Sequence, residues 1–363
     1  MNNVNRNTYQ KPKGDELRNS SNNYPSNQYQ FNREKLYKEY MRIIGLILCV
    51  DFMGYPLNSF EEQWARTDFH HLRIPQRVAY KWPQIDKNSI WNGAILNRKS
   101  HDYYHFVESV DLDTALIIKA AMMKISDLFF DPSLIRLTDD VKRLIAKVCF
   151  RLIDESLTSF EEKNKDNPKL KEYCTLQRRH FDCDDNMINN LKCYPRSINT
   201  NQLYTIESCS LFSQYHYVIG KHLETDFMGY SIHPLEKKEN ELTYHHLRIS
   251  PEIADRWLGK SNKDLIWNGA LLKRKSRDYL HYIEQTDLRS YLLVEARMLG
   301  ISDLFIDPSL IRLDNDEKRF IAISHFRNID GVLTDFEREH AGKRRKGKKL
   351  IIDSYANGRV FGE

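Results

Sequence analysis

The stretch "NRKSHDYYHFVE" occupies residues 97–108, and a near copy, "KRKSRDYLHYIE", occupies residues 273–284. Both copies keep one histidine, His105 and His281, but four residues earlier the first copy has His101 where the second has Arg277. Side chains four residues apart lie on the same face of a helix. If these stretches are helical, the first copy therefore presents two imidazoles side by side, and the second presents an imidazole and a guanidinium.

The copies belong to a long internal repeat. "HHLRI" begins at residues 70 and 245, an offset of 245 − 70 = 175, and "WNGA" begins at residues 91 and 267, an offset of 267 − 91 = 176. "DFMGY" and "DPSLIRL" also occur twice in the same order. This period is far longer than the 20–50 residues of a solenoid repeat. It predicts two tandem domains of ordinary size.

The repeat and the composition divide the chain into five parts. We predict a first module over residues 33–163 and a second over 205–340, joined by a linker at 164–204 that is rich in Asn, Lys and Asp. Residues 1–32 are polar, without the apolar core of a signal peptide, and are predicted to be a disordered arm. Residues 341–363 form a basic tail.

Composition limits the class of protein. Hydrophobic residues make up 41% and charged residues 29%, which is enough apolar material to build cores. No apolar run approaches the roughly 18 residues of a membrane span, so we expect no membrane association. The six cysteines form no CxxC pair, which predicts neither a disulfide framework nor a cysteine zinc site and favours the reducing cytoplasm.

The local patterns predict an α+β protein that is predominantly helical. Each module is expected to open with a helical lead-in, at 33–49 and at about 208–223, followed by a turn at "DFMGY". The segments 67–72 and 242–247 alternate apolar and polar residues as short strands do. A helix is expected to begin near Ser100 and near Ser276, since serine is a good helix N-cap. Amphipathic helices such as 112–129 would supply most of the core.

The histidines of the first module are spaced as a metal site requires. Successive side chains on a strand point to opposite faces, so only one of His70 and His71 can face the His101–His105 pair. Three neutral histidines with an open coordination position, beside a fourth that is not a ligand, form a workable hydrolytic centre. Each element alone is common in proteins that bind no metal. The ordered combination of HH, Asn92 and HxxxH, largely repeated in the second copy, favours a functional site.

These residues resemble the core of the HNH endonucleases, also called ββα-metal or His-Me finger nucleases. "NGAILNRKSHDYYH" (92–105), preceded by the His70–His71 pair, follows that family's frame. The resemblance implies two tandem ββα-metal modules, each with added helices. It implies that His71 is the general base, that Asn92 holds the loop and the base, and that the metal ligands are His70, His101 and His105. The implied cofactor is one divalent ion (Mg, Mn, Zn or Ni), and the implied reaction is hydrolysis of double-stranded DNA to 5′-phosphate and 3′-hydroxyl ends.

The chain departs from the family at the cysteines that often bind a structural zinc. Asn97 and Ser100 stand at those positions in the first copy, and Lys273 and Ser276 in the second. We therefore expect packing to hold each module together, around four tryptophans at repeated positions: Trp82, Trp91, Trp257 and Trp267.

The second copy lacks one of the implied ligands. His245, His246, Asn268 and His281 are retained, but Arg277 replaces the counterpart of His101. An arginine stays protonated and has no acceptor atom, so the second module is expected to bind metal poorly and not to cleave. Its guanidinium suits a DNA phosphate instead, and the second module would then act as a DNA clamp.

Further charged residues leave two interpretations open. The tail contains six cations in eight positions, which either contact nucleic acid phosphates or form a solvated tail: Lys343, Arg344, Arg345, Lys346, Lys348 and Lys349. Glu108 and Glu284, three residues after the last histidine of each copy, could accept hydrogen bonds from the histidines. A solvated helix face is the interpretation that we prefer for these two glutamates.

The sequence thus predicts a metal-dependent DNA endonuclease with an active first module, in which a homodimer would be needed to cut both strands together. Two other classes stay open. The protein could be a catalytically inert nucleic-acid-binding factor on a nuclease-derived scaffold, or a structural protein with a protein partner and core histidines.

Overall fold

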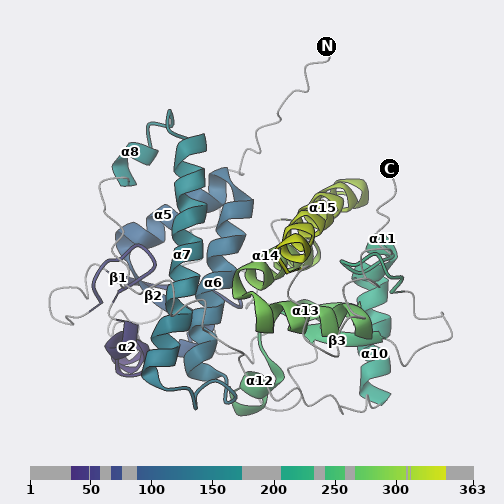
Figure 1. Cartoon of the computed structure of the whole chain (residues 1–363), viewed down its shortest axis with the longest axis horizontal. Helices are drawn as coiled ribbons and strands as arrows, with labels where there is room; N and C mark the ends of the chain where they lie inside the picture. The colour runs from purple at the N-terminus through teal and green to yellow at the C-terminus, as the bar shows by residue number, and fades with distance from the viewer. Residues whose placement is uncertain are drawn as a thin grey trace, which may run out of the picture.

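The computed structural model describes residues 34–48, 50–57, 67–75, 88–173, 206–232, 242–257, 266–307, 310 and 312–340. This part of the chain is mostly helical, with two small antiparallel sheets (Figure 1), as expected for the α+β class. None of its helices combines the length and the apolar character that crossing a membrane requires.

The two halves of the chain repeat one order of elements. The first half contains η1 (Met41–Gly45), α2 (Leu46–Leu48), β1 (Thr67–His71), η3 (Ile90–Asn92), β2 (Gly93–Asn97), α5 (Arg98–Val110), α6 (Leu112–Phe130), α7 (Asp139–Lys163) and α8 (Leu170–Tyr173). The second contains α10 (Ile206–Tyr215), η4 (His216–Gly220), α11 (Lys221–Leu223), β3 (Leu242–His246), α12 (Pro251–Trp257), η6 (Ile266–Asn268), β4 (Gly269–Lys273), α13 (Arg274–Thr286), α14 (Leu288–Ile306) and α15 (Asn315–His340). The predicted short strands and the long helix after the HxxxH segment are confirmed.

A hairpin of two strands carries the first histidine pair. β1 pairs with β2 in antiparallel register, with His70 opposite Ala94 and His71 opposite Gly93. A Cβ atom on Gly93 would lie 2.2 Å from the carbonyl oxygen of His70. The glycine of "WNGA" therefore allows the two backbones to approach, and the Asn-Gly pair is not a hairpin turn. β3 and β4 repeat this register.

The "DFMGY" turn fastens the start of α5 through a buried aspartate. The backbone of Gly54 has a φ of 80°, which glycine adopts without strain. One oxygen of Asp51 accepts from the backbone of the turn, at Met53 and Tyr55. The other accepts from the Ser100 hydroxyl at 2.6 Å and from the backbone of Asn97 at 3.0 Å. Asp226 and Ser276 repeat this arrangement in the second half.

The role predicted for Ser100 as a helix cap is therefore wrong. α5 begins at Arg98, and the side chain of Asn97 caps it by accepting from the backbone N–H of Lys99 at 3.0 Å. Ser100 lies in the first turn and is fully buried, because its hydroxyl is the donor that the buried Asp51 carboxylate needs.

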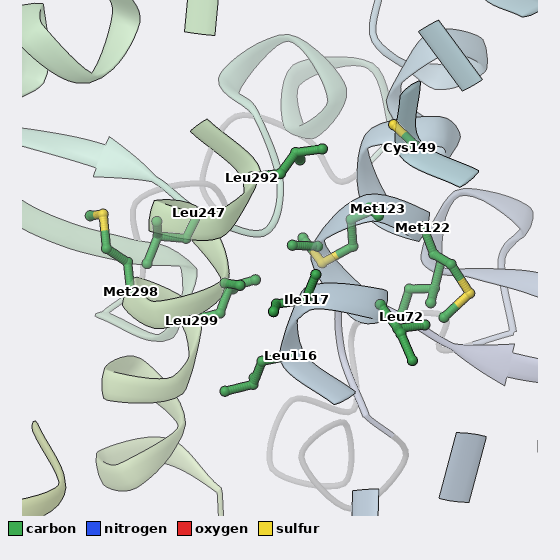
Figure 2. Close-up of a cluster of buried hydrophobic side chains, with 14 of the residues drawn as sticks. Leu72, Leu116, Ile117, Met122, Met123, Cys149, Leu247, Leu292, Met298 and Leu299 are labelled. Carbon is green, nitrogen blue, oxygen red and sulfur yellow. The ribbon is translucent and has the colours of Figure 1, made fainter. Parts of the chain in front are cut away.

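The two modules share one core. α6 packs against α7 on one side and against α14 of the second module on the other, and most of its side chains are buried. Figure 2 shows the apolar contact between the modules, where Leu116 and Ile117 of α6 face Leu292 and Leu299 of α14. A helix that is apolar around most of its circumference must be covered on several sides. The modules are thus packed together and are not independent bodies on a linker.

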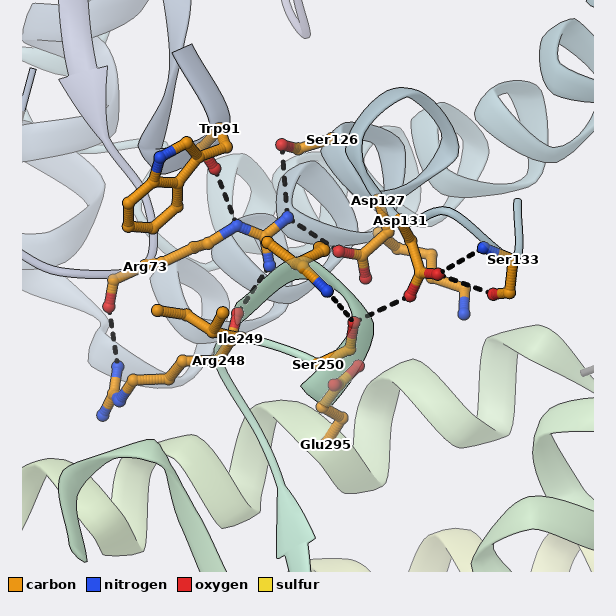
Figure 3. A network of polar contacts seen from close by, with 12 residues as sticks. Arg73, Trp91, Ser126, Asp127, Asp131, Ser133, Arg248, Ile249, Ser250 and Glu295 are labelled. Carbon is orange, nitrogen blue, oxygen red and sulfur yellow. Dashed lines mark hydrogen bonds and ion pairs between the residues drawn. The ribbon is translucent and has the colours of Figure 1, made fainter. Parts of the chain in front are cut away.

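Two buried arginines join the modules reciprocally. Arg73, the arginine of "HHLRI", donates from Nη1 to the backbone carbonyl of Arg248 at 2.5 Å, and Arg248 donates to the carbonyl of Arg73 at 3.4 Å. Each guanidinium is also paired with an aspartate of its own module, Asp127 or Asp303. Figure 3 shows Arg73 between the modules, with further bonds to the Trp91 carbonyl and the Ser126 hydroxyl. Contacts exchanged between equivalent residues are those of a two-fold interface.

Several sequence predictions lie at or beyond the edge of the described residues. The start of the predicted linker is structured: residues 170–173 form α8, whose Tyr173 ring stacks on Phe106 of α5 at 5.6 Å. Trp91 is buried as expected. The arm at 1–32, the rest of the linker from 174, Trp82 and the tail cations fall outside the described residues, as do the side chains of Trp257 and Trp267.

Candidate metal centre

Three histidines of the first module converge on one point. His70 comes from β1, and His101 and His105 come from successive turns of α5. One ring nitrogen from each lies within 4.8 Å of the others, the only such group of potential metal ligands among the described residues. The ring centroids of His101 and His105 are 4.6 Å apart, and that of His70 lies 5.3 Å and 5.4 Å from them. The hairpin and the helix thus build the predicted triad.

The spacing of the nitrogens suits a tetrahedral ion. The Nε2 atoms of His101 and His105 are 3.3 Å apart. Zinc binds imidazole nitrogen at about 2.0–2.1 Å, so two ligands of a tetrahedral site are separated by about 3.3–3.4 Å. Adjacent ligands of an octahedral ion at about the same bond length would be only about 2.8–3.0 Å apart. This edge is therefore compatible with two ligands of a tetrahedral ion.

The pKa values of two histidines of the triad are lowered. Burial, reinforced by the imidazoles of His105 and His101, holds the pKa of His70 well below its ordinary value. Burial and His105 also lower the pKa of His101. Both rings are therefore neutral near pH 7, and neutral imidazole is the form that binds a metal ion.

Glu108 orients one of the three rings. Its Oε2 lies 3.1 Å from Nδ1 of His105. A carboxylate can only accept here, so Nδ1 carries the proton and Nε2 presents its lone pair toward the triad. The preferred interpretation of Glu108 as part of a solvated helix face is therefore wrong, although its side chain stays one quarter exposed.

His71 lies beside the triad but points away from it. Its ring shares a strand face with Phe69, with the ring centroids 5.1 Å apart. The Nε2 atom of His71 is 3.3 Å from the Oδ1 atom of Asn88. The tautomer that donates to this oxygen has its lone pair on Nδ1. Asn88 was missed in the sequence because it stands in an irregular segment before "IWNGA", with no periodic pattern to single it out.

Asn92 holds the loop that follows β1. It is fully buried, its Oδ1 accepts from the backbone N–H of Ile74 at 2.8 Å, and its Nδ2 donates to the Ile74 carbonyl at 3.2 Å. The loop part of the predicted role thus agrees with the geometry, and Asn88 makes a hydrogen bond with His71. Asn268 makes the same two contacts with Ile249.

Because both copies use this asparagine alike, Asn92→Ala and Asn268→Ala should destabilise the protein equally. Each would leave a buried backbone N–H and C=O without partners, and we expect a loss of about 1–3 kcal/mol in the free energy of unfolding. Urea unfolding of the full chain measures it. Asn88→Ala, at an exposed position, is the control and should change stability by less than about 0.5 kcal/mol. Wild-type stability in both buried variants would show that other contacts hold the loop.

The second module retains the positions of two of the three histidines, but an arginine replaces the third. His245 and His281 have ring centroids 5.5 Å apart, nearly the spacing of His70 and His105. The guanidinium of Arg277 donates to the Thr243 hydroxyl at 3.0 Å. His246 packs on Tyr244 as His71 packs on Phe69. Only the third imidazole is missing from the arrangement.

The glutamate of the second module has a different partner. Glu284 accepts from His281 at 3.3 Å, as Glu108 does from His105, but it also forms a 2.7 Å ion pair with Lys124 of α6. Both side chains of that pair are almost completely buried. The position equivalent to Lys124 is Gly300, where a Cβ atom would lie 2.7 Å from a methyl carbon of Leu116. Lys124 of the first module therefore binds the glutamate of the second module's histidine–glutamate pair. The second module makes no equivalent contact with Glu108, because glycine at position 300 has no side chain.

Restoring the third imidazole tests how much of the site survives. Arg277→His should raise the zinc content from about one to about two ions per chain, because His245 and His281 already have the required spacing. Metal analysis after dialysis against zinc measures it. Arg277→Gln removes the charge without adding a ligand and should stay near one. A zinc content near one ion per chain in both variants would mean that a third imidazole is not sufficient, and that the ion pair between Lys124 and Glu284 prevents metal binding in the second module.

No family model, curated protein or solved structure matches this chain.

Proposed function

We propose that the protein is a metal-dependent endonuclease that hydrolyses phosphodiester bonds in double-stranded DNA, with its active site in the first module. The observation that carries the proposal is the convergence of His70, His101 and His105 next to a fourth histidine, His71. The donor set of three imidazoles suits a divalent ion and leaves a coordination position open for a substrate oxygen.

Each residue of the site has a distinct task in this proposal. The bound ion would polarise a phosphoryl oxygen and stabilise the charge on the leaving oxygen. His71 accepts the proton of the attacking water at Nδ1 while Asn88 holds its Nε2–H. Glu108 keeps His105 in the tautomer that offers Nε2 to the ion. Asn92 keeps the loop after β1 in place, and with it the direction of both strand histidines.

The difference between the modules determines the expected product. A single active site hydrolyses one phosphodiester at a time, and Arg277 leaves the second module without a third ligand. One chain should therefore nick one strand of a duplex, and cutting both strands at once would require two chains.

Cleavage of supercoiled plasmid by the full chain, with each of the four candidate ions and with a chelator, tests the proposal. We expect open circles to appear first, linear DNA to appear late, and the chelator to stop both products. Immediate linear product at low protein concentration would show that both modules cut. No cleavage with any ion, together with retained DNA binding, would favour the inert nucleic-acid-binding alternative.

A further inference from the structure

The surface of the second module that corresponds to the metal centre is unusually basic. Three cations follow one another at the start of α13, which we call the α13 basic cluster: Arg274, Lys275 and Arg277. Arg274 and Lys275 are exposed and Arg277 is half-buried. Their counterparts in the first module are Arg98, Lys99 and His101, so the second copy has one guanidinium more.

The second copy also has one carboxylate fewer at this surface. In the first module Asp68 of β1 pairs with Arg98 at 3.3 Å. The residue equivalent to Asp68 is Thr243, a neutral side chain whose hydroxyl accepts from Arg277. Asp278, four residues after Arg274, is matched by Asp102 in the first module. Glu284 is already neutralised by Lys124. The replacements of Asp68 by Thr243 and of His101 by Arg277 therefore both shift the local charge in the positive direction.

The dipole of α13 does not favour these cations. Positive charges near the first turn oppose the helix dipole and cost stability there, and α13 has no acidic residue in its first turn to offset them. Lys273, which replaces the capping Asn97, makes no side-chain cap. A negatively charged binding partner would interact favourably with these cations and so offset their unfavourable interaction with the helix dipole.

The chemistry of the cluster fits phosphate. Arg277 uses one N–H for Thr243, and a guanidinium has five such donors in a planar fork that can contact two phosphate oxygens together. Arg274, three residues before Arg277, lies on the same face of the helix, and both Arg274 and Lys275 add exposed charge at the start of α13. Because β3 and α13 repeat β1 and α5, Arg277 occupies the place that His101 occupies beside the proposed metal ion.

We infer that the α13 basic cluster binds backbone phosphates of double-stranded DNA and holds the duplex without cutting it. The inference rests on the proposed function, because it takes the substrate of the first module as the ligand of the second. In the first module the site would hold a phosphate through a metal ion, and in the second it would hold one through a fixed guanidinium. The second module then contributes affinity while the first contributes chemistry.

Duplex binding by the full chain, measured in the presence of a chelator so that the DNA stays intact, tests this inference. The variant Arg274→Gln/Lys275→Gln/Arg277→Gln removes the cluster. The control Arg312→Gln/Arg319→Gln/Arg327→Gln removes the same charge from exposed positions on and next to α15. The slope of log affinity against log salt is negative, and we expect its magnitude to decrease by about 2–3 in the cluster variant, about 0.9 per lost phosphate contact. The control should keep the wild-type slope.

The outcomes separate the inference from the proposed function. A wild-type chain that cuts plasmid, with equal slopes in the two variants, would overturn the inference and leave the nuclease intact. A chain that binds through the cluster but does not cut with any ion would leave the inference standing and overturn the nuclease. Absence of duplex binding by the wild-type chain, or tighter binding to duplex RNA than to DNA, would overturn the inference directly.

Discussion

Replacing His71 with alanine is expected to slow DNA cleavage by about 10²–10⁴-fold, the usual contribution of a positioned general base. Metal content should not change, because the three nitrogens that converge belong to His70, His101 and His105. The measurements are initial rates of plasmid nicking at saturating protein and metal analysis of the same sample. Loss of rate with retained metal would separate proton transfer from metal binding.

Two matched variants sharpen this result. His246→Ala makes the same change at the equivalent position of the second module, and the nicking rate should stay at the wild-type value. His105→Ala removes a proposed ligand, so that both metal content and rate should fall. If the His71→Ala protein nicks at the wild-type rate, His71 is not the base and the roles assigned within the site are wrong.

Replacing Lys124 with methionine is expected to destabilise the whole protein by about 3–5 kcal/mol, the cost of leaving one member of a buried ion pair without its partner. The Nζ atom of Lys124 lies 2.7 Å from the Oε1 atom of Glu284, and the side chains are only 2% and 4% exposed. Methionine keeps most of the volume of lysine, so the loss would reflect the buried carboxylate rather than a cavity. Urea unfolding of the full chain provides the measurement.

A second substitution identifies the cause. Lys124→Met combined with Glu284→Gln removes both charges and should recover much of the lost stability, because uncharged residues often replace a buried pair at little cost. The exposed pair between Arg289 and Glu155 also joins the two modules, and Arg289→Ala should cost only about 0–1 kcal/mol. Equal effects of Lys124→Met and Arg289→Ala would mean that the buried pair contributes no more than a surface pair.

One half of the histidine triad, the His101–His105 pair, could be predicted from the sequence because it depends on local geometry. A four-residue spacing on a helix is sufficient to place His101 beside His105. The approach of His70 depends on the pairing of β1 with β2 and on their contact with α5, and the sequence indicated it only through the resemblance to the HNH endonucleases. The buried role of Ser100 could not be predicted in this way, because it depends on Asp51, which is distant in sequence and is brought close by the turn. A serine before a helical segment has the same sequence signature whether it caps the helix or lies inside it.

The joining of the modules was missed for a similar reason. The polar stretch between the repeats was predicted to be a linker, which says nothing of how the modules pack, whereas the segment 112–130 is apolar on nearly all sides. That pattern is typical of a helix covered by more than one partner, and it was the available signal. The arginine of "HHLRI" recurs in both copies, but its partner is a backbone carbonyl of the other copy, and no side-chain pattern marks such an acceptor.

The reciprocal contact between Arg73 and Arg248 has a consequence for how the protein responds to dilution. Two separate chains joined by such an interface would come apart as their concentration falls, but here a covalent connection supplies each half with its partner at a constant effective concentration. The unfolding midpoint of the fused interface should then not vary with the amount of protein. Fusion also allows the two halves to differ in sequence. Lys124 of the first half corresponds to Gly300 of the second, a difference that two identical subunits could not have, because any substitution in their gene changes both copies.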